Sequence, residues 1–242
     1  MISAVSAATL GFLLGLRHAT DADHVVAVTA IVSRERSFAR AARIGALWGI
    51  GHSLTVIVLG GALVVFRIAI PPRVGLGLEF AVALVLILLG FSNLRTPAAV
   101  SVETATDVDT ATAAAGTDAA VASARATTAE SARTGWRPLA VGVIHGLAGS
   151  AAVAILVLAA IPQTAWALAY LVVFGLGTIV GMTVITWLIA APAVLAAGRV
   201  VRFQRGIRLA AGALSLLFGL VLAREIVVEG GLFSEQPTWS PR

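Results

Sequence analysis

Residues 2–32 read ISAVSAATLGFLLGLRHATDADHVVAVTAIV, an apolar segment interrupted by the polar group RHATDADH at 17–24. About 20 apolar residues span the hydrocarbon core of a bilayer, so this segment is long enough to cross one. A charged side chain at the bilayer centre costs roughly 2.5–3.5 kcal/mol on insertion scales. Two histidines, two aspartates and an arginine so close together therefore predict a membrane helix that faces a protein-lined polar cavity.

The rest of the chain has the same apolar character. Of its 242 residues, 59% are hydrophobic and 12% are charged, which excludes an ordinary soluble domain. Length and hydropathy predict an all-α polytopic membrane protein of about six transmembrane helices. We expect these helices at residues 2–32, 44–66, 75–94, 138–161, 165–191 and 206–228. The fifth is expected to end before Pro192, because proline usually interrupts a helix.

Composition divides the chain into four parts. Residues 1–94 form a first three-helix transmembrane half, and residues 138–228 form a second. Between them, residues 95–137 are rich in Ala, Thr, Ser and Asp with few large apolar side chains, which predicts a flexible loop. Residues 229–242 form a polar tail.

The positive charge of the chain is concentrated in short loops. The net charge is +5, and arginines gather at 34–43, 95–137 and 199–208, whereas few lie in the opposite loops. The positive-inside rule places the arginine-rich loops in the cytoplasm and both termini outside. Membrane orientation thus explains the charge better than nucleic-acid binding. The chain has no cysteine, which excludes disulfides and thiolate metal ligands.

The two halves resemble each other around a histidine. GLRH at 15–18 precedes a run that ends in VVAV at 25–28, and GVIH at 142–145 precedes one that ends in AVAI at 152–155. With three helices per half, these segments would cross the membrane in opposite directions. The similarity suggests a 3+3 inverted repeat, a common transporter plan that places the site at the repeat interface.

The polar residues of the apolar segments form a candidate metal site. Imidazole and carboxylate together suit divalent transition metals such as nickel, cobalt and zinc. The candidate ligands are His18, Asp21, Asp23, His24, His52 and His145. On a straight helix His18 and His24 would lie ~9 Å apart, too far to bind one ion together. Either the helix is interrupted there, which would bring Asp23 round to the site, or the residues are successive stations along a path.

A structural role is the alternative for each of these residues. The cluster at 17–24 could be a buried polar network that fixes helix packing, with Arg17 paired to Asp21 or Asp23. A lone intramembrane histidine such as His52 or His145 could be a hydrogen-bonded packing residue. The glycines beside His52 favour the metal role, because they let its helix approach a neighbour closely.

No enzymatic motif accompanies these residues. The sequence has neither a phosphate-binding glycine loop nor a Ser-His-Asp pattern, so neither nucleotide hydrolysis nor another enzymatic activity is expected.

The segment RHATDADHV at 17–25 resembles the signature of the nickel/cobalt transporter (NiCoT) family, in which a histidine is followed by four residues and then Asp-His. LWGIGHS at 47–53 is similar to the second conserved region of that family. HGLAGS at 145–150 and GTIVGMT at 177–183 are more similar to the shorter branch related to the urease accessory protein H. The resemblance touches both halves and most helices.

The resemblance implies nickel or cobalt uptake across the cytoplasmic membrane, with His18, Asp23 and His24 in the metal path and Asp21 in the acidic position between them. It also implies a link to maturation of nickel enzymes such as urease or hydrogenase. The chain departs from the longer members, because no acidic motif follows His145 and the second half supplies fewer ligands.

The sequence thus predicts a secondary transporter, a permease for a divalent cation, with nickel as first cargo and cobalt as second. No prosthetic group is expected. A membrane potential alone favours entry of a divalent cation by ~4.6 kcal/mol per 100 mV. The alternatives are an exporter of metal or of a small anion, and an intramembrane haem or redox protein with histidine pairs as axial ligands.

Overall fold

The computed structural model describes residues 4–33, 35, 37–68, 70–95, 135–161, 163–195 and 201–239, with side chains omitted at 4–7, 149–160, 193 and 201–204. The predicted flexible loop at 95–137 therefore lies almost wholly outside the described residues. Every regular element in the described part is a helix, which confirms the predicted all-α class.

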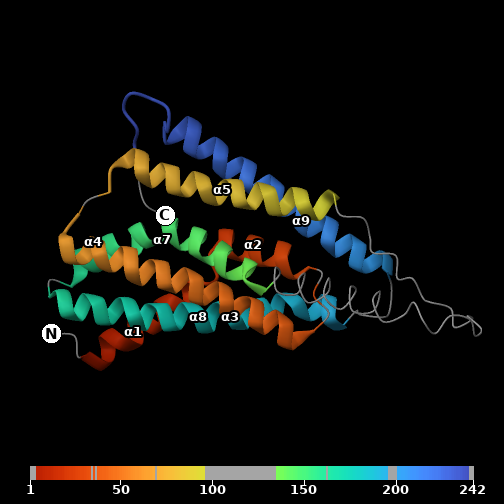
Figure 1. Cartoon of the computed structure of the whole chain (residues 1–242), viewed down its shortest axis with the longest axis horizontal. Helices are drawn as coiled ribbons and strands as arrows, with labels where there is room; N and C mark the ends of the chain where they lie inside the picture. The colour runs from red at the N-terminus through yellow and green to blue at the C-terminus, as the bar shows by residue number, and fades with distance from the viewer. Residues whose placement is uncertain are drawn as a thin grey trace, which may run out of the picture. The chain divides into compact units, whose positions relative to one another are not determined.

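The helices follow one another along the chain as Figure 1 shows. They are α1 (Ala4–His18), α2 (Ala22–Val32), α3 (Phe38–Thr55), α4 (Gly61–Phe66), α5 (Pro72–Arg95), α7 (Arg137–Ala160), α8 (Thr164–Leu195) and α9 (Val201–Arg224). Two π-helical turns complete them, η1 (Val56–Gly60), which joins α3 to α4, and η2 (Glu225–Glu229), which extends α9.

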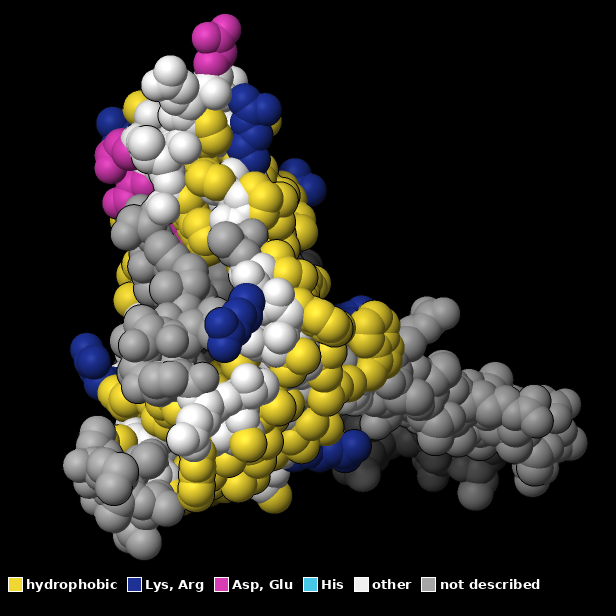
Figure 2. Space-filling view, turned by 90° about the vertical axis from the view of Figure 1, so that its left-hand side faces the viewer, with side chains coloured by type: hydrophobic (Ala, Val, Ile, Leu, Met, Phe, Trp, Pro, Cys, Tyr) yellow, Lys and Arg dark blue, Asp and Glu magenta, His cyan; other side chains and the backbone are white. Residues whose placement is uncertain are grey.

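The bundle is that of a membrane protein. Four helical segments, Phe38–Phe66, Pro72–Arg95, Thr164–Pro192 and Arg205–Glu229, are long and apolar enough to cross a bilayer. Large hydrophobic side chains on these segments, such as Val58, Leu88 and Leu217, are exposed. Figure 2 shows a broad area of hydrophobic side chains on one face. Such a surface is unfavourable in water and suits lipid.

The first predicted helix is broken in the middle. α1 ends at His18 and α2 begins at Ala22. Between them, the Thr20 amide donates to the Arg17 carbonyl at 2.8 Å and the Asp21 amide donates to the His18 carbonyl at 3.1 Å, so the last turn tightens. Asp21 is then extended and occupies the N-cap of α2, a position that aspartate favours. Of the two arrangements open from the sequence, the structure has the interrupted helix.

Three predicted helix boundaries were wrong, one of them the start of α9, which lies at Val201 and not near residue 206. Pro192 lies inside α8, which continues to Leu195. Proline is tolerated there because it removes only one backbone hydrogen bond near the helix end, and membrane helices accommodate such losses. α3 begins at Phe38 and not near residue 44, and in this first part of the helix the Arg40 side chain extends outward to Glu35, with Nε 2.9 Å from Oε1.

The described part of the polar tail packs on the start of α5. The Trp239 indole nitrogen donates to Glu79 Oε1 at 2.8 Å, and Arg73 donates to the Ser234 carbonyl at 2.9 Å. The Trp239 ring lies directly over Gly75, where a side chain would collide with it. The tail therefore belongs to the helical unit and shields the polar end of α5.

Packing in the bundle relates the two halves. α1 and α3 both pack on α8, and α5 pairs with α9 (Figure 1). Gly15 of α1 fits against the backbone of Phe174 and Thr178 on α8. On α7, Gly142 fits in the same way against the backbone of Trp48 and His52 on α3.

A second pair of contacts repeats this relation. Gly177 of α8 meets the Phe12 backbone of α1, and Gly51 of α3 meets the Leu139 backbone of α7. The first helix of each half thus packs on the second helix of the other half through equivalent glycines. These contacts are the ones an inverted repeat predicts, although α1 and α2 are separated by a break and α7 is continuous.

We expect Gly15→Ala and Gly142→Ala each to destabilise the protein by about 1–3 kcal/mol, because the added methyl group would collide with backbone of the neighbouring helix. Gly77→Ala is the matched control, since nothing lies within 4 Å of its methyl group. Thermal unfolding in detergent would test this. Equal melting temperatures for all three variants would contradict the packing described.

Candidate metal centre

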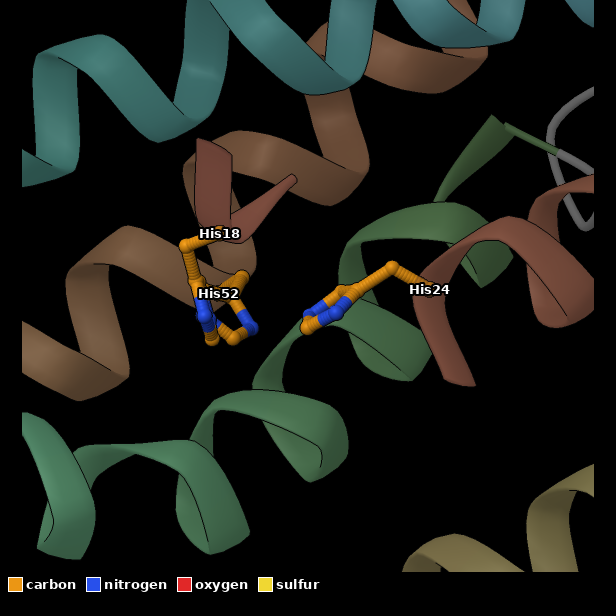
Figure 3. Close-up of side chains that lie close together, drawn as sticks. All are labelled: His18, His24 and His52. Carbon is orange, nitrogen blue, oxygen red and sulfur yellow. The ribbon is translucent and has the colours of Figure 1, made fainter. Parts of the chain in front are cut away.

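Three histidines from three helices converge in the interior of the bundle. His18 ends α1, His24 lies in the first turn of α2, and His52 lies in the last turn of α3. Figure 3 shows the His24 ring reaching toward the other two rings. His18 Nε2 lies 3.1 Å from His52 Nε2, and one ligand atom from each residue lies within 4.8 Å of the others. We name these three residues the histidine triad.

A second group shares His24 with the histidine triad. Asp23, His24 and His145 also offer ligand atoms within 4.8 Å of one another. Asp23 Oδ2 lies 3.0 Å from His145 Nε2 in a hydrogen bond, and Asp23 Oδ1 lies 3.1 Å from His24 Nδ1. The Asp23 carboxylate therefore connects α2 with α7, which belong to different halves of the chain.

The remaining predicted residue, Asp21, is at the edge of the cluster. Its Oδ2 lies 2.8 Å from His18 Nδ1, while the side chain is 49% exposed. The structure thus brings together all six residues that the sequence singled out. Asp23 joins the cluster because the helix is broken. On a straight helix its side chain would have pointed away from His18 and His24.

Several polar atoms of the cluster are buried without a hydrogen bond. In the described part of the chain these are both ring nitrogens of His24, Nδ1 of His52, Nδ1 of His145 and the indole nitrogen of Trp48. An unsatisfied buried polar group costs about 1–3 kcal/mol. Imidazole nitrogens are metal donors, so a bound divalent cation would compensate part of this cost. The donor set and its unpaired nitrogens fit a transition-metal ion.

Glycines allow the close approach of the helices that carry the cluster. A Cβ atom at Gly146 would meet the His52 backbone, and one at Gly51 would meet the Leu139 carbonyl. α3 and α7 therefore lie nearly backbone to backbone beside His52 and His145, as the glycines around His52 predicted. The π-helical turn η1 begins four residues after His52, and such turns occur frequently at functional sites.

Two features of the centre differ from the sequence-based expectation. Arg17 is exposed, and the described ion pairs do not join it to Asp21 or Asp23. Trp48 was missed: its ring is fully buried, with its centroid 5.6 Å from that of His145 and 6.2 Å from that of His24. Its position one helical turn before His52 is the sequence feature that could have identified it as part of the centre.

Fold and site together define an all-helical membrane protein with an intramembrane histidine–aspartate cluster. Over 232 residues the chain is 32% identical to the urease accessory protein UreH of Bacillus sp. (strain TB-90), and the match covers 96% of each chain. The chain belongs to the family of this protein.

A more distant relative comes from a plant. The chloroplast protein FOR GROWTH AND FERTILITY 1 of Arabidopsis thaliana is 26% identical over 183 residues, which are 74% of this chain and 48% of the plant protein. Neither a family model nor a solved structure matches the chain.

We expect His24→Ala to weaken Co²⁺ binding by more than about tenfold relative to His145→Ala, because His24 belongs to both groups. Isothermal titration of the purified protein in detergent would measure this. Arg224→Ala is the control, since Arg224 is exposed and pairs only with Glu229 at 3.5 Å among the described ion pairs. If His24→Ala bound Co²⁺ as the control does, His24 would not be a shared ligand.

Proposed function

We propose that the chain is a secondary transporter of the NiCoT type that moves a divalent transition-metal cation across the cytoplasmic membrane into the cell. Ni²⁺ is the proposed cargo, with Co²⁺ next. The observation that carries the proposal is the cluster of four imidazoles and the Asp23 carboxylate inside an apolar bundle, with Asp21 at its edge and ring nitrogens that have no hydrogen-bond partner among the described residues.

The chemistry of the cluster supports this cargo. Imidazole nitrogen suits nickel, cobalt and zinc, and neighbouring carboxylates compensate the double positive charge of the ion. The His18 and His52 Nε2 atoms, 3.1 Å apart, fall within the separation of about 2.8–3.4 Å between adjacent ligands on one ion with metal–nitrogen bonds of ~2.0–2.1 Å. The same separation disfavours the haem alternative, because axial ligands on opposite sides of one iron lie about 4 Å apart.

The relationship to UreH supports a role in the maturation of a nickel enzyme. That relative is named an accessory protein of urease. We propose that this chain serves the maturation of a nickel enzyme, either urease or hydrogenase, by supplying the metal. It would do so as a carrier and not as an enzyme, with both termini outside and the arginine-rich loops in the cytoplasm, as the positive-inside rule predicts.

Uptake of radioactive nickel into proteoliposomes tests this function. We expect an inside-negative potential to accelerate uptake, and Co²⁺ to compete more strongly than Zn²⁺. Efflux from preloaded vesicles without uptake would show an exporter. A Soret band in the purified protein would show a haem protein.

We expect His52→Gln and His145→Gln each to raise the Ni²⁺ concentration for half-maximal uptake by about tenfold or more, at equal expression. Glutamine keeps much of the size and hydrogen bonding of histidine but is a poorer metal donor. Thr183→Val is the matched control in the same bundle, because the Thr183 hydroxyl donates only to the Ile179 carbonyl of its own helix, at 2.7 Å. Unchanged half-saturation in both histidine variants would favour the packing role.

A further inference from the structure

The six polar residues of the centre divide into atoms that are already paired and atoms that are free. Asp23 Oδ2 and His145 Nε2 form a hydrogen bond of 3.0 Å, and Asp21 Oδ2 lies 2.8 Å from His18 Nδ1. In the histidine triad, by contrast, His24 Nε2 is buried without a partner in the described part of the chain. The two Nε2 atoms of His18 and His52 face only each other among the described contacts.

We propose that the cargo cation is bound by the Nε2 atoms of His18, His24 and His52, and that Asp21 and Asp23 are positioning residues that orient these imidazoles. This inference rests on the proposed function for the identity of the cation, and it assigns different tasks to residues that the sequence alone presents as equivalent ligands.

Asp21 favours one tautomer of His18. A neutral imidazole carries one N–H, and the carboxylate 2.8 Å from Nδ1 favours placing it there. The lone pair is then on Nε2, 3.1 Å from His52 Nε2. Metal-binding histidines commonly present their second nitrogen to a carboxylate in this way, which fixes the tautomer and makes the ligating nitrogen more basic.

Asp23 stands in the same relation to His24. Its Oδ1 lies 3.1 Å from His24 Nδ1, so a small rotation of the ring produces a hydrogen bond and leaves Nε2 for the cation. Its other oxygen is occupied by His145. Asp23 therefore connects the proposed ligand His24 on α2 to His145 on α7 of the other half. Cation binding to the histidine triad would thus act on helices of both halves.

The backbone around the two carboxylates also disfavours a cation in contact with them. Asp21 is the N-cap of α2 and Asp23 lies in its first turn. The positive end of the helix dipole at this position stabilises carboxylates and repels cations. The exposed Arg17, at the end of α1, adds positive charge nearby in sequence. Of the histidine triad only His24 lies on this turn, and its ring reaches toward those of His18 and His52 (Figure 3).

Co²⁺ binding by the full-length protein in detergent, followed by visible absorption and X-ray absorption spectroscopy, tests the inference. The wild type is expected to show three imidazole ligands. His18→Ala and His52→Gln should lose one imidazole and change the d–d spectrum. Asp21→Ala, Asp23→Ala and His145→Gln should keep three imidazoles and an unchanged spectrum. Affinity should fall by about 10–100-fold in the two aspartate variants, and by about tenfold in His145→Gln, because His145 holds Asp23 in place at 3.0 Å.

Asparagine distinguishes the two roles of the carboxylates. In Asp21→Asn the amide oxygen still accepts from His18 Nδ1, so the affinity should recover most of the loss seen in Asp21→Ala. A ligand carboxylate would not be replaced in this way, because the neutral amide is a much poorer donor to a divalent cation. Size-exclusion profiles of all variants would establish that they are folded.

Each outcome of these experiments either supports or contradicts the ligand assignment. A changed spectrum in Asp21→Asn or Asp23→Ala, or a wild type that binds no Co²⁺, would overturn the assignment of the cation to the histidine triad. Three imidazoles in the wild type without Ni²⁺ uptake in proteoliposomes would support the assignment and contradict the transport function. Uptake together with altered spectra in the aspartate variants would support transport and contradict the assignment.

Discussion

The Asp23 carboxylate and the imidazoles on either side of it join parts of the chain that are far apart in sequence. A carboxylate in an apolar bundle requires polar partners, and Asp23 finds a hydrogen bond to His145 of α7 and lies 3.1 Å from His24 Nδ1 of its own helix. To reach both, it must lie on the first turn of a new helix, which is why α1 and α2 are separate. The helix break places Asp23 beside the buried imidazoles, and the glycine contacts of α7 with α3 hold His145 in the same part of the bundle.

The glycine contacts and the polar cluster support each other. Gly142 and Gly146 bring α7 to the backbone of α3 at Trp48 and His52, so that His145 and His52 enter the same space. On the opposite side, Ser53 donates to the Gly175 carbonyl of α8 at 2.9 Å and fixes α3 there as well. Because α3 is held between α7 and α8, His52 has little freedom to move. The histidine triad is therefore preorganised by backbone packing, and the exposed Asp21 is its most accessible polar group.

The sequence predicted the site better than it predicted the backbone that holds it. Histidine and aspartate are so unfavourable in hydrocarbon that their positions alone indicated a common cavity, and the structure places all six together. It could not specify the break after His18, because a polar cluster is compatible with a straight helix as well as with an interrupted one. The helix end at Pro192 and the start of α3 were also misjudged, because neither a proline near a helix end nor an arginine beside a loop fixes a boundary. Trp48 was missed although its place one helical turn before His52 put it on the same face of the helix.

The two halves carry different side chains at equivalent places in their packing. Thr178 occupies on α8 the place that His52 occupies on α3, and both positions face a glycine of the opposite half through backbone atoms. The Thr178 hydroxyl donates to the Phe174 carbonyl of its own helix at 3.0 Å. The contacts between helices at these two positions therefore use backbone atoms, whereas the side chains that the positions carry differ. The same packing thus holds an imidazole in one half of the chain and a hydroxyl in the other.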